Sequence, residues 1–145
     1  MSEGAAEASE AALVEFLLAM PVVRMLGIRV ISCRAGETEL ELPVRHDLTF
    51  DGQAVQGGIV GAFADFAGAS AAGTMLPAGW LVMTTGFEVH NLAPARGERL
   101  VGIGTVLKPG RVLGVSRADV FAVAGAARRL CATALVTTRG VERER

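Results

Sequence analysis

The stretch QGGIVGAFADFAGASAA, from Gln56 to Ala72, decides the fold. It contains no proline and one charged side chain, Asp65, and it is much longer than a typical strand. Larger residues recur at steps of three and four, as they do on the buried face of a helix: Ile59, Phe63, Phe66 and Ser70. The sequence therefore predicts a long, buried central helix.

Asp65 lies off this stripe, on a face made of very small residues. Steps of three, four and seven from it reach Gly58, Gly61, Gly68, Ala69 and Ala72. Glycine inside a helix costs roughly 0.5 to 1 kcal/mol relative to alanine, so we expect these positions to let another backbone or a slim ligand approach. A carboxylate among small apolar groups loses water, which perturbs its pKa and makes Asp65 the first candidate for a catalytic group.

Composition restricts the class of protein. The 145 residues are 51% hydrophobic and 20% charged, which fits one globular domain with a substantial core. The net charge of −1 gives no basis for binding nucleic acid or an anionic membrane surface. No segment reaches the ~20 uninterrupted apolar residues of a membrane span, and the acidic N-terminus differs from a secretory signal.

The two cysteines, Cys33 and Cys131, lie in apolar runs without CxxC spacing. We expect reduced core thiols, in keeping with a cytoplasmic location. No cluster of His, Cys, Asp and Glu has metal-ligand spacing, so we expect no metal. The absence of a Gly-x-Ser-x-Gly sequence argues against a serine triad.

The remaining chain predicts one further helix and six strands. Residues 1–8 are expected to form a flexible acidic tail, and Ser9 to cap a helix that ends at Pro21. Apolar and alternating runs predict strands over 26–33, 37–44, 81–90, 100–107, 112–123 and 130–138. In the third of these, Thr84 is expected on the face opposite to Phe87 and Val89.

The order of these elements indicates the architecture. Turns between successive strands favour antiparallel pairing, with Ala35-Gly36 as the turn of an early hairpin. Two strands, one long helix and four more strands predict an α+β domain over residues 9–140. In this domain an antiparallel sheet wraps around the central helix.

Four pieces of the sequence then combine into a recognisable pattern. They are Gln56-Gly57-Gly58, Phe63-Ala64-Asp65, Glu88-Val89-His90-Asn91 and the turn Pro94-Ala95-Arg96-Gly97. Their spacing, and the element order from about Leu13 to Thr138, resemble the hotdog-fold acyl-CoA thioesterases of the phenylacetate-pathway (PaaI) type. The chain differs at Gln56, where that family usually has histidine. A glutamine amide can donate a hydrogen bond but cannot act as an acid or base.

The resemblance implies a hotdog fold that hydrolyses acyl-CoA thioesters to a free acid and CoA, without any cofactor beyond the CoA of the substrate. Asp65 would act as general base or nucleophile. The backbone N–H of Gly57 would polarise the thioester carbonyl, assisted by Gln56. Residues expected along the substrate are Gly58, His46, Phe50, Ser70, His90 and Asn91. The resemblance also implies homodimers that join their sheets edge to edge and pair into homotetramers.

Alternatives remain open at this stage. Gln56, and Ala69 where some relatives place a Ser or Thr, favour a hotdog module that binds an acyl thioester without cleaving it. Asp65 could instead pair with an arginine, His46 and His90 could be surface histidines, and Asn91 could cap a turn. The arginines that could bind CoA phosphates or be solvated loop charges are Arg96, Arg99, Arg111 and Arg117.

Helix geometry alone, without reference to any family, predicts how the active site is assembled. Gly57 and Asp65 are eight residues apart, which places their backbones about 12 Å apart along one helix. An attacking group and an oxyanion donor must both lie about 3 Å from one reacting centre. We therefore expect each active site to combine Asp65 of one chain with Gly57 of a second chain.

Overall fold

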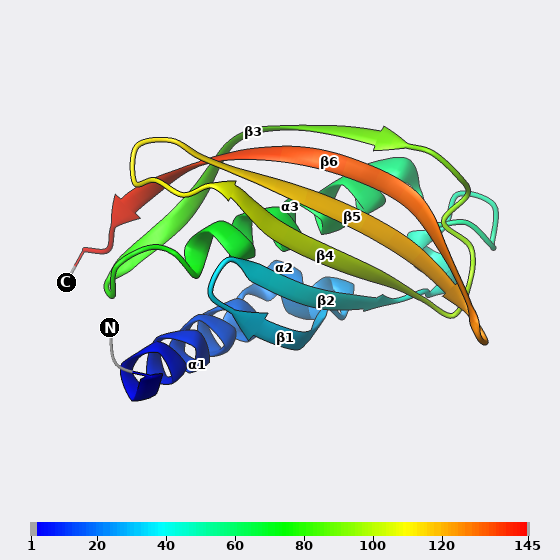
Figure 1. Cartoon of the computed structure of the whole chain (residues 1–145). Coiled ribbons are helices and arrows are strands. Elements are labelled where there is room, and N and C mark those ends of the chain that lie inside the picture. The colour runs from blue at the N-terminus through cyan, green and yellow to red at the C-terminus, as the bar shows by residue number, and fades with distance from the viewer. Residues whose placement is uncertain (1–2, 145) are drawn as a thin grey trace.

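The computed structural model of the protein describes residues 3–144, without the side chains of Ala6 and Ala8. The helices are α1 (Glu3–Ala19), α2 (Pro21–Leu26), the short 3-10 helix η1 (His46–Leu48) and α3 (Gly57–Gly73). The strands are β1 (Arg29–Arg34), β2 (Glu37–Pro43), β3 (Trp80–Asn91), β4 (Arg99–Lys108), β5 (Gly114–Ala124) and β6 (Ala127–Glu142), as Figure 1 shows.

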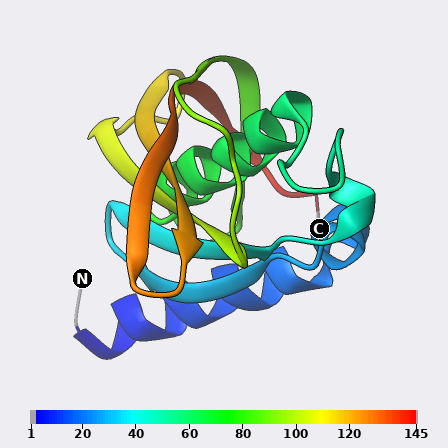
Figure 2. The ribbon, with the colours of Figure 1, turned by 90° about the vertical axis from the view of Figure 1, so that its right-hand side faces the viewer.

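The six strands form one antiparallel sheet in the order β1-β2-β4-β5-β6-β3. The sheet curves around α3, as Figure 2 shows. The predicted antiparallel sheet wrapped around a central helix is therefore confirmed. β1 and β3 are the two edges of the sheet, and β3 brings its residues alongside α3.

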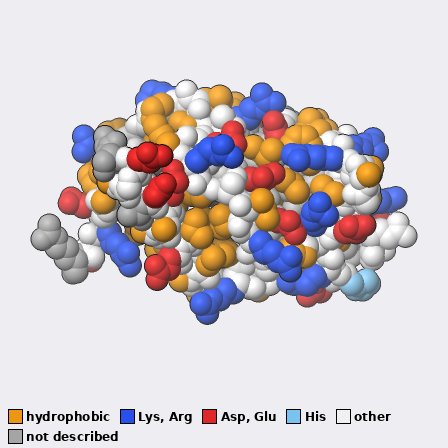
Figure 3. Space-filling model, turned by 60° about the horizontal axis from the view of Figure 1, so that its bottom comes forward, with side chains coloured by type: hydrophobic (Ala, Val, Ile, Leu, Met, Phe, Trp, Pro, Cys, Tyr) orange, Lys and Arg blue, Asp and Glu red, His pale blue; other side chains and the backbone are white. Residues whose placement is uncertain are grey.

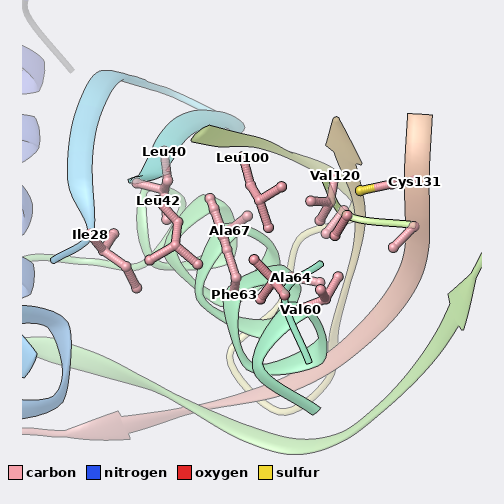
Figure 4. Close-up of a cluster of buried hydrophobic side chains, with 14 of the residues drawn as sticks. Ile28, Leu40, Leu42, Val60, Phe63, Ala64, Ala67, Leu100, Val120 and Cys131 are labelled. Carbon is pink, nitrogen blue, oxygen red and sulfur yellow. The ribbon is translucent and has the colours of Figure 1, made fainter. Parts of the chain in front are cut away.

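The core lies between α3 and the concave face of the sheet, because α3 presents its apolar stripe to that face. Phe63 is fully buried at the centre of this contact (Figure 4). Its ring atoms lie 3.1 Å from the position that a Cβ on Gly102 would occupy, so glycine makes room for the ring. Other buried contributors include Leu40, Leu42, Val60, Ala64, Ala67, Leu100 and Val120.

Two features of the N-terminal part differ from the prediction. α1 begins at Glu3, so Ser9 lies inside it instead of capping it, because alanine-rich sequence propagates helix readily. Residues 1 and 2 of the predicted tail lie outside the described residues. Pro21 starts the short helix α2, since proline at the first helical position forfeits no hydrogen bond. Gly27, at φ 77°, ends α2 in the left-handed conformation.

The face prediction for β3 is also corrected. The β3–β6 register shifts between Thr84 and Gly86, which marks a β-bulge. Thr84 pairs with Thr138, and Phe87 pairs with Val136, both of which are buried on the concave face. Thr84 and Phe87 therefore share the face that looks toward α3, although strict alternation would separate them.

Candidate active site

The N-terminus of α3 exposes two backbone donors beside a cavity. Gln56 is the N-cap, and its Oε1 accepts a hydrogen bond of 3.0 Å from the N–H of Ile59. The N–H groups of Gly57 and Gly58 find no acceptor among the described residues. Such unpaired N–H groups, at the positive end of the helix dipole, stabilise developing negative charge.

The cavity beside these donors has a volume of about 340 Å³. Its wall is mostly apolar, and polar groups enter it at Gly57 and Asn91. It is lined by Phe50, Ala54, Val55, Gly57, Val60, Asn91, Leu92, Ala93, Pro94 and Ala95. An apolar cavity with a few converging polar groups is the usual form of a small-molecule site.

Asp65 lies two turns further along α3 and is half-buried. Its Oδ1 accepts a hydrogen bond of 2.7 Å from the hydroxyl of Thr84. Burial raises the pKa of Asp65 above its usual value, and the Thr84 hydroxyl opposes that rise. No Lys or Arg forms an ion pair with Asp65 in the described part of the chain. A structural ion pair is therefore not what holds this acid.

Thr84 is a site residue that the sequence-based reasoning missed. The bulge at Thr85 turns it toward α3, and a period-two pattern places it on the other face. The available signal was Gly86, because glycine inside a strand often marks a bulge. β3 thus supplies the partner that orients the carboxylate of Asp65.

The sequence and the fold can be compared with those of known proteins. No protein-family model matches the sequence, and no curated protein matches it either. A solved structure of a thioesterase family protein from Silicibacter pomeroyi is 32% identical, with a TM-score of 0.87, over 92% of this chain and 98% of that one. The chain belongs to the thioesterase family. This membership supports thioester hydrolysis of a small-molecule substrate as the general activity.

More distant solved structures share the fold. A thioesterase from Haemophilus influenzae is 22% identical, with a TM-score of 0.80, over 92% of this chain and 90% of that one. The PaaI protein of the E. coli phenylacetic acid degradation operon is 20% identical, with a TM-score of 0.79, over 95% of this chain and 94% of that one. These likenesses confirm the predicted hotdog fold.

Within this thioesterase fold, the predicted site residues divide into groups. Gln56, Gly57 and Gly58 lie together at the start of α3, with Phe50 and Asn91 at the adjoining cavity. Phe50 is 71% exposed at the rim. Asp65 and Gly57 belong to one unbroken helix, so the separation of about 12 Å between their backbones applies.

Three other predicted site residues do not line the cavity beside Gly57. Ser70 is buried, and its hydroxyl is 2.9 Å from that of Thr38 on β2, because it lies on the core-facing side of α3. His90 is exposed, and its Nε2 is 2.8 Å from Oε1 of Glu88. His46 is exposed on η1, and its Nε2 lies 3.5 Å from the position of a Cβ on Gly52.

The small-residue face of α3 serves more than one purpose. Gly68 is buried, and a Cβ there would lie 2.6 Å from Cγ2 of Val136, so this glycine allows α3 to pack on β6. Gly61 faces β3 instead, with Val89 Cγ1 3.3 Å from the position of its Cβ. Close approach explains both glycines, and in each case the approaching element is a strand of the same chain.

On the face that Figure 3 shows, basic and acidic side chains are interspersed. The candidate phosphate ligands lie next to other side chains: Arg96 is 3.5 Å from Asp51, Arg99 is 3.7 Å from Glu41, Arg117 is 3.0 Å from Asp119, and Arg111 is 5.4 Å from the centre of the Trp80 ring. Each of these arginines thus already has a carboxylate or an aromatic ring as a neighbour.

The cysteines and the possible metal ligands give no sign of a second reactive site in the described residues. Cys33 and Cys131 are free thiols, and burial raises the pKa of Cys131 to about 11, which disfavours the reactive thiolate. Over residues 3–144, no three His, Cys, Asp or Glu side chains come together as metal ligands. No helix in that range is long and apolar enough to cross a membrane.

Proposed function

We propose that the protein hydrolyses acyl-CoA thioesters to a free acid and CoA, with Asp65 and the N–H of Gly57 as the reacting machinery. The observation that carries this proposal is Asp65 itself. It is half-buried, has no basic partner among the described residues, has a raised pKa, and is oriented by Thr84. A structural aspartate on a helix needs none of these features, whereas a general base does.

The reaction follows from the roles of these groups. As general base, the Asp65 carboxylate takes a proton from a water molecule while the water oxygen bonds to the thioester carbon. The carbonyl electrons move to oxygen, where the N–H of Gly57 stabilises them. Collapse of this intermediate breaks the carbon–sulfur bond, and the CoA thiolate takes up the proton that Asp65 accepted from water. As nucleophile, the Asp65 carboxylate would instead attack the thioester carbon and displace the CoA thiolate, and water would then hydrolyse the resulting anhydride to the free acid and the Asp65 carboxylate.

Two copies of the chain make one site in this proposal. β3 is a 12-residue edge strand, and a long edge with exposed apolar side chains favours pairing with another strand. Met83 and Phe87 on this strand are 54% and 47% exposed. If two β3 strands pair antiparallel, the α3 helices of the two protomers also run antiparallel. A two-fold axis that passes near residue 61, midway between Gly57 and Asp65, then brings Asp65 of one protomer opposite Gly57 of its partner. Association of such dimers into tetramers stays a prediction.

A panel of aromatic and aliphatic acyl-CoAs, monitored for free thiol release, tests the function. Wild type should cleave at least one member, and Asp65→Asn should lose nearly all of that activity, because the amide lacks basicity and anionic nucleophilicity. Asp119→Asn is a matched control, since Asp119 also accepts a threonine hydrogen bond, of 2.8 Å from Thr133. Full activity in folded Asp65→Asn would refute the assignment.

A module that binds acyl thioesters without cleaving them is the second candidate. Gln56 favours it, because its Oε1 caps α3 and its amide has no acid–base function. Calorimetry with the same acyl-CoA panel separates the two functions. Binding without thiol release across the whole panel would establish the module and exclude the hydrolase.

A further inference from the structure

Asn91, the last residue of β3, presents a side-chain amide beside the first glycine of α3. Its Nδ2 lies 3.2 Å from the position that a Cβ on Gly57 would occupy. The side chain makes no hydrogen bond with the described residues, and it lines the same 340 Å³ cavity as Gly57. Asn91 therefore does not cap a turn, and its donor is available to a molecule in that cavity.

We propose that the Asn91 amide is a second hydrogen-bond donor to the thioester carbonyl oxygen, beside the N–H of Gly57. This inference rests on the proposed function and adds a catalytic residue to it. Backbone nitrogen and Cβ are about 2.5 Å apart in one residue, so Nδ2 of Asn91 is at most about 5.7 Å from the nitrogen of Gly57. Two donors that each lie about 2.9 Å from one oxygen can be up to about 5.8 Å apart. One oxygen atom can therefore bridge them.

The neighbouring amide of Gln56 is less suited to this task. Its Oε1 is held by the N–H of Ile59, which ties the side chain to the edge of the helix. The Asn91 amide has no such tie, and it approaches the cavity from the strand side. A side chain at residue 57 would press on Nδ2 at 3.2 Å, which gives Gly57 a reason to be glycine. The site then has one donor from α3 and one from β3.

A donor to this oxygen acts mainly in the transition state, because hydrogen bonds strengthen as negative charge develops on the acceptor. Asn91→Ala should therefore lower kcat with little change in KM. The loss of one such donor typically costs about 10²-fold to 10³-fold, and Asn91 is exposed, so we expect about tenfold to a hundredfold. Gln53→Ala, which removes another exposed amide, should behave as wild type.

The Asn91→Asp variant distinguishes two roles for Asn91, as a hydrogen-bond donor or as a purely structural residue. Aspartate has the shape of asparagine, but its carboxylate accepts hydrogen bonds and repels a developing oxyanion. If Asn91 is a donor, Asn91→Asp should be slower than Asn91→Ala. If its role were only to fill space or to shape β3, the near-isosteric Asp variant would be the faster one, and the proposal would fail. Equal thermal unfolding temperatures would show that the variants are folded.

A spectroscopic measurement tests the same contact without turnover. In the Asp65→Asn background a bound aromatic acyl-CoA stays intact, and its carbonyl stretching frequency should fall on binding because both donors polarise the bond. Adding Asn91→Ala should remove part of that shift, and an unchanged shift would overturn the proposal. If wild type cleaves no acyl-CoA, the proposed function fails on its own. If wild type cleaves and Asn91→Ala matches it, only the role of Asn91 fails.

Discussion

Thr84→Val removes the hydroxyl that holds the Asp65 carboxylate while nearly keeping the shape of the side chain. The hydrogen bond is 2.7 Å long, and hydrogen bonds to charged groups contribute about 1.5 to 3 kcal/mol. Both residues are half-buried, so water competes and the lower end applies. Because about 1.4 kcal/mol corresponds to tenfold in rate, we expect kcat to fall about tenfold if the loss appears fully in the transition state.

The pH dependence should change as well, with a definite sign. The Thr84 hydroxyl lowers the pKa of Asp65 against the effect of burial, so its removal raises that pKa. A general base works when deprotonated, and the acidic limb of the kcat/KM profile should therefore move to higher pH in Thr84→Val.

Thiol release measured across pH for three variants tests this role of the Thr84 hydroxyl. Thr84→Ser keeps the hydroxyl and should stay close to wild type. Thr133→Val removes the equivalent hydroxyl next to Asp119 and should also leave activity unchanged. A wild-type rate and acidic limb in Thr84→Val, or a Thr84→Ser variant impaired as strongly as Thr84→Val, would contradict this role of the Thr84 hydroxyl.

Three further predictions concern stability and the residue before the glycines. The raised folded pKa of Asp65 means that its contribution to stability is present below the usual Asp pKa of about 3.9 and lost as pH rises through the folded value. Asp65→Asn should thus increase the free energy of unfolding at neutral pH and not in acid, as urea unfolding at both pH values would report. Gln56→Ala should lower the free energy of unfolding by about 1 kcal/mol, because it removes the acceptor that caps the N–H of Ile59, and it should lower kcat/KM modestly. Gln56→His should keep or raise activity. A wild-type rate in folded Gln56→Ala would exclude its side chain from catalysis. Gly104→Ala should prevent stable folding, because its Cβ would collide with the carbonyl oxygen of Ala67, and a soluble variant with the wild-type unfolding temperature would contradict this close packing.

The central helix was predictable because its signal is local and redundant. A proline-free apolar run with Phe63 on one face and Asp65 on another has one reasonable interpretation, and the boundaries observed agree with it. The early hairpin was predictable for the same reason, since Gly36 adopts the positive φ of 82° that its turn requires. Periodicity and turn residues carry this information without any tertiary contact.

Sequence patterns did not reveal where three side chains of the site region lie, because their positions depend on tertiary contacts. Ser70 lies one residue beyond Ala69, but rotation about the helix turns it into the core, where Thr38 supplies its partner. Thr84 reaches Asp65 because of a bulge that alternation does not reveal. Asn91 is placed beside Gly57 by the register of β3 in the sheet, which the sequence does not specify. Motif spacing names Ser70 and Asn91, but the positions of these side chains, and of Thr84, depend on strand pairing and packing.

Complementation between two inactive variants tests whether Asp65 of one chain acts together with Gly57 of a second chain. Gly57→Pro removes the N–H at the first position of α3, where proline is tolerated. Gln56, at φ −60° and ψ 137°, already has the conformation that a following proline requires. Each variant alone, Gly57→Pro or Asp65→Asn, should be inactive as a folded homodimer.

The decisive measurement is thiol release by mixed dimers of these two variants, prepared by co-refolding and confirmed by mass. One of the two sites in such a dimer combines a wild-type Asp65 with a wild-type Gly57, so we predict recovery of up to about half of the wild-type activity per mixed dimer. Well-folded mixed dimers that show no recovery would contradict the shared site, and the acid and the donor would then have to act within one chain.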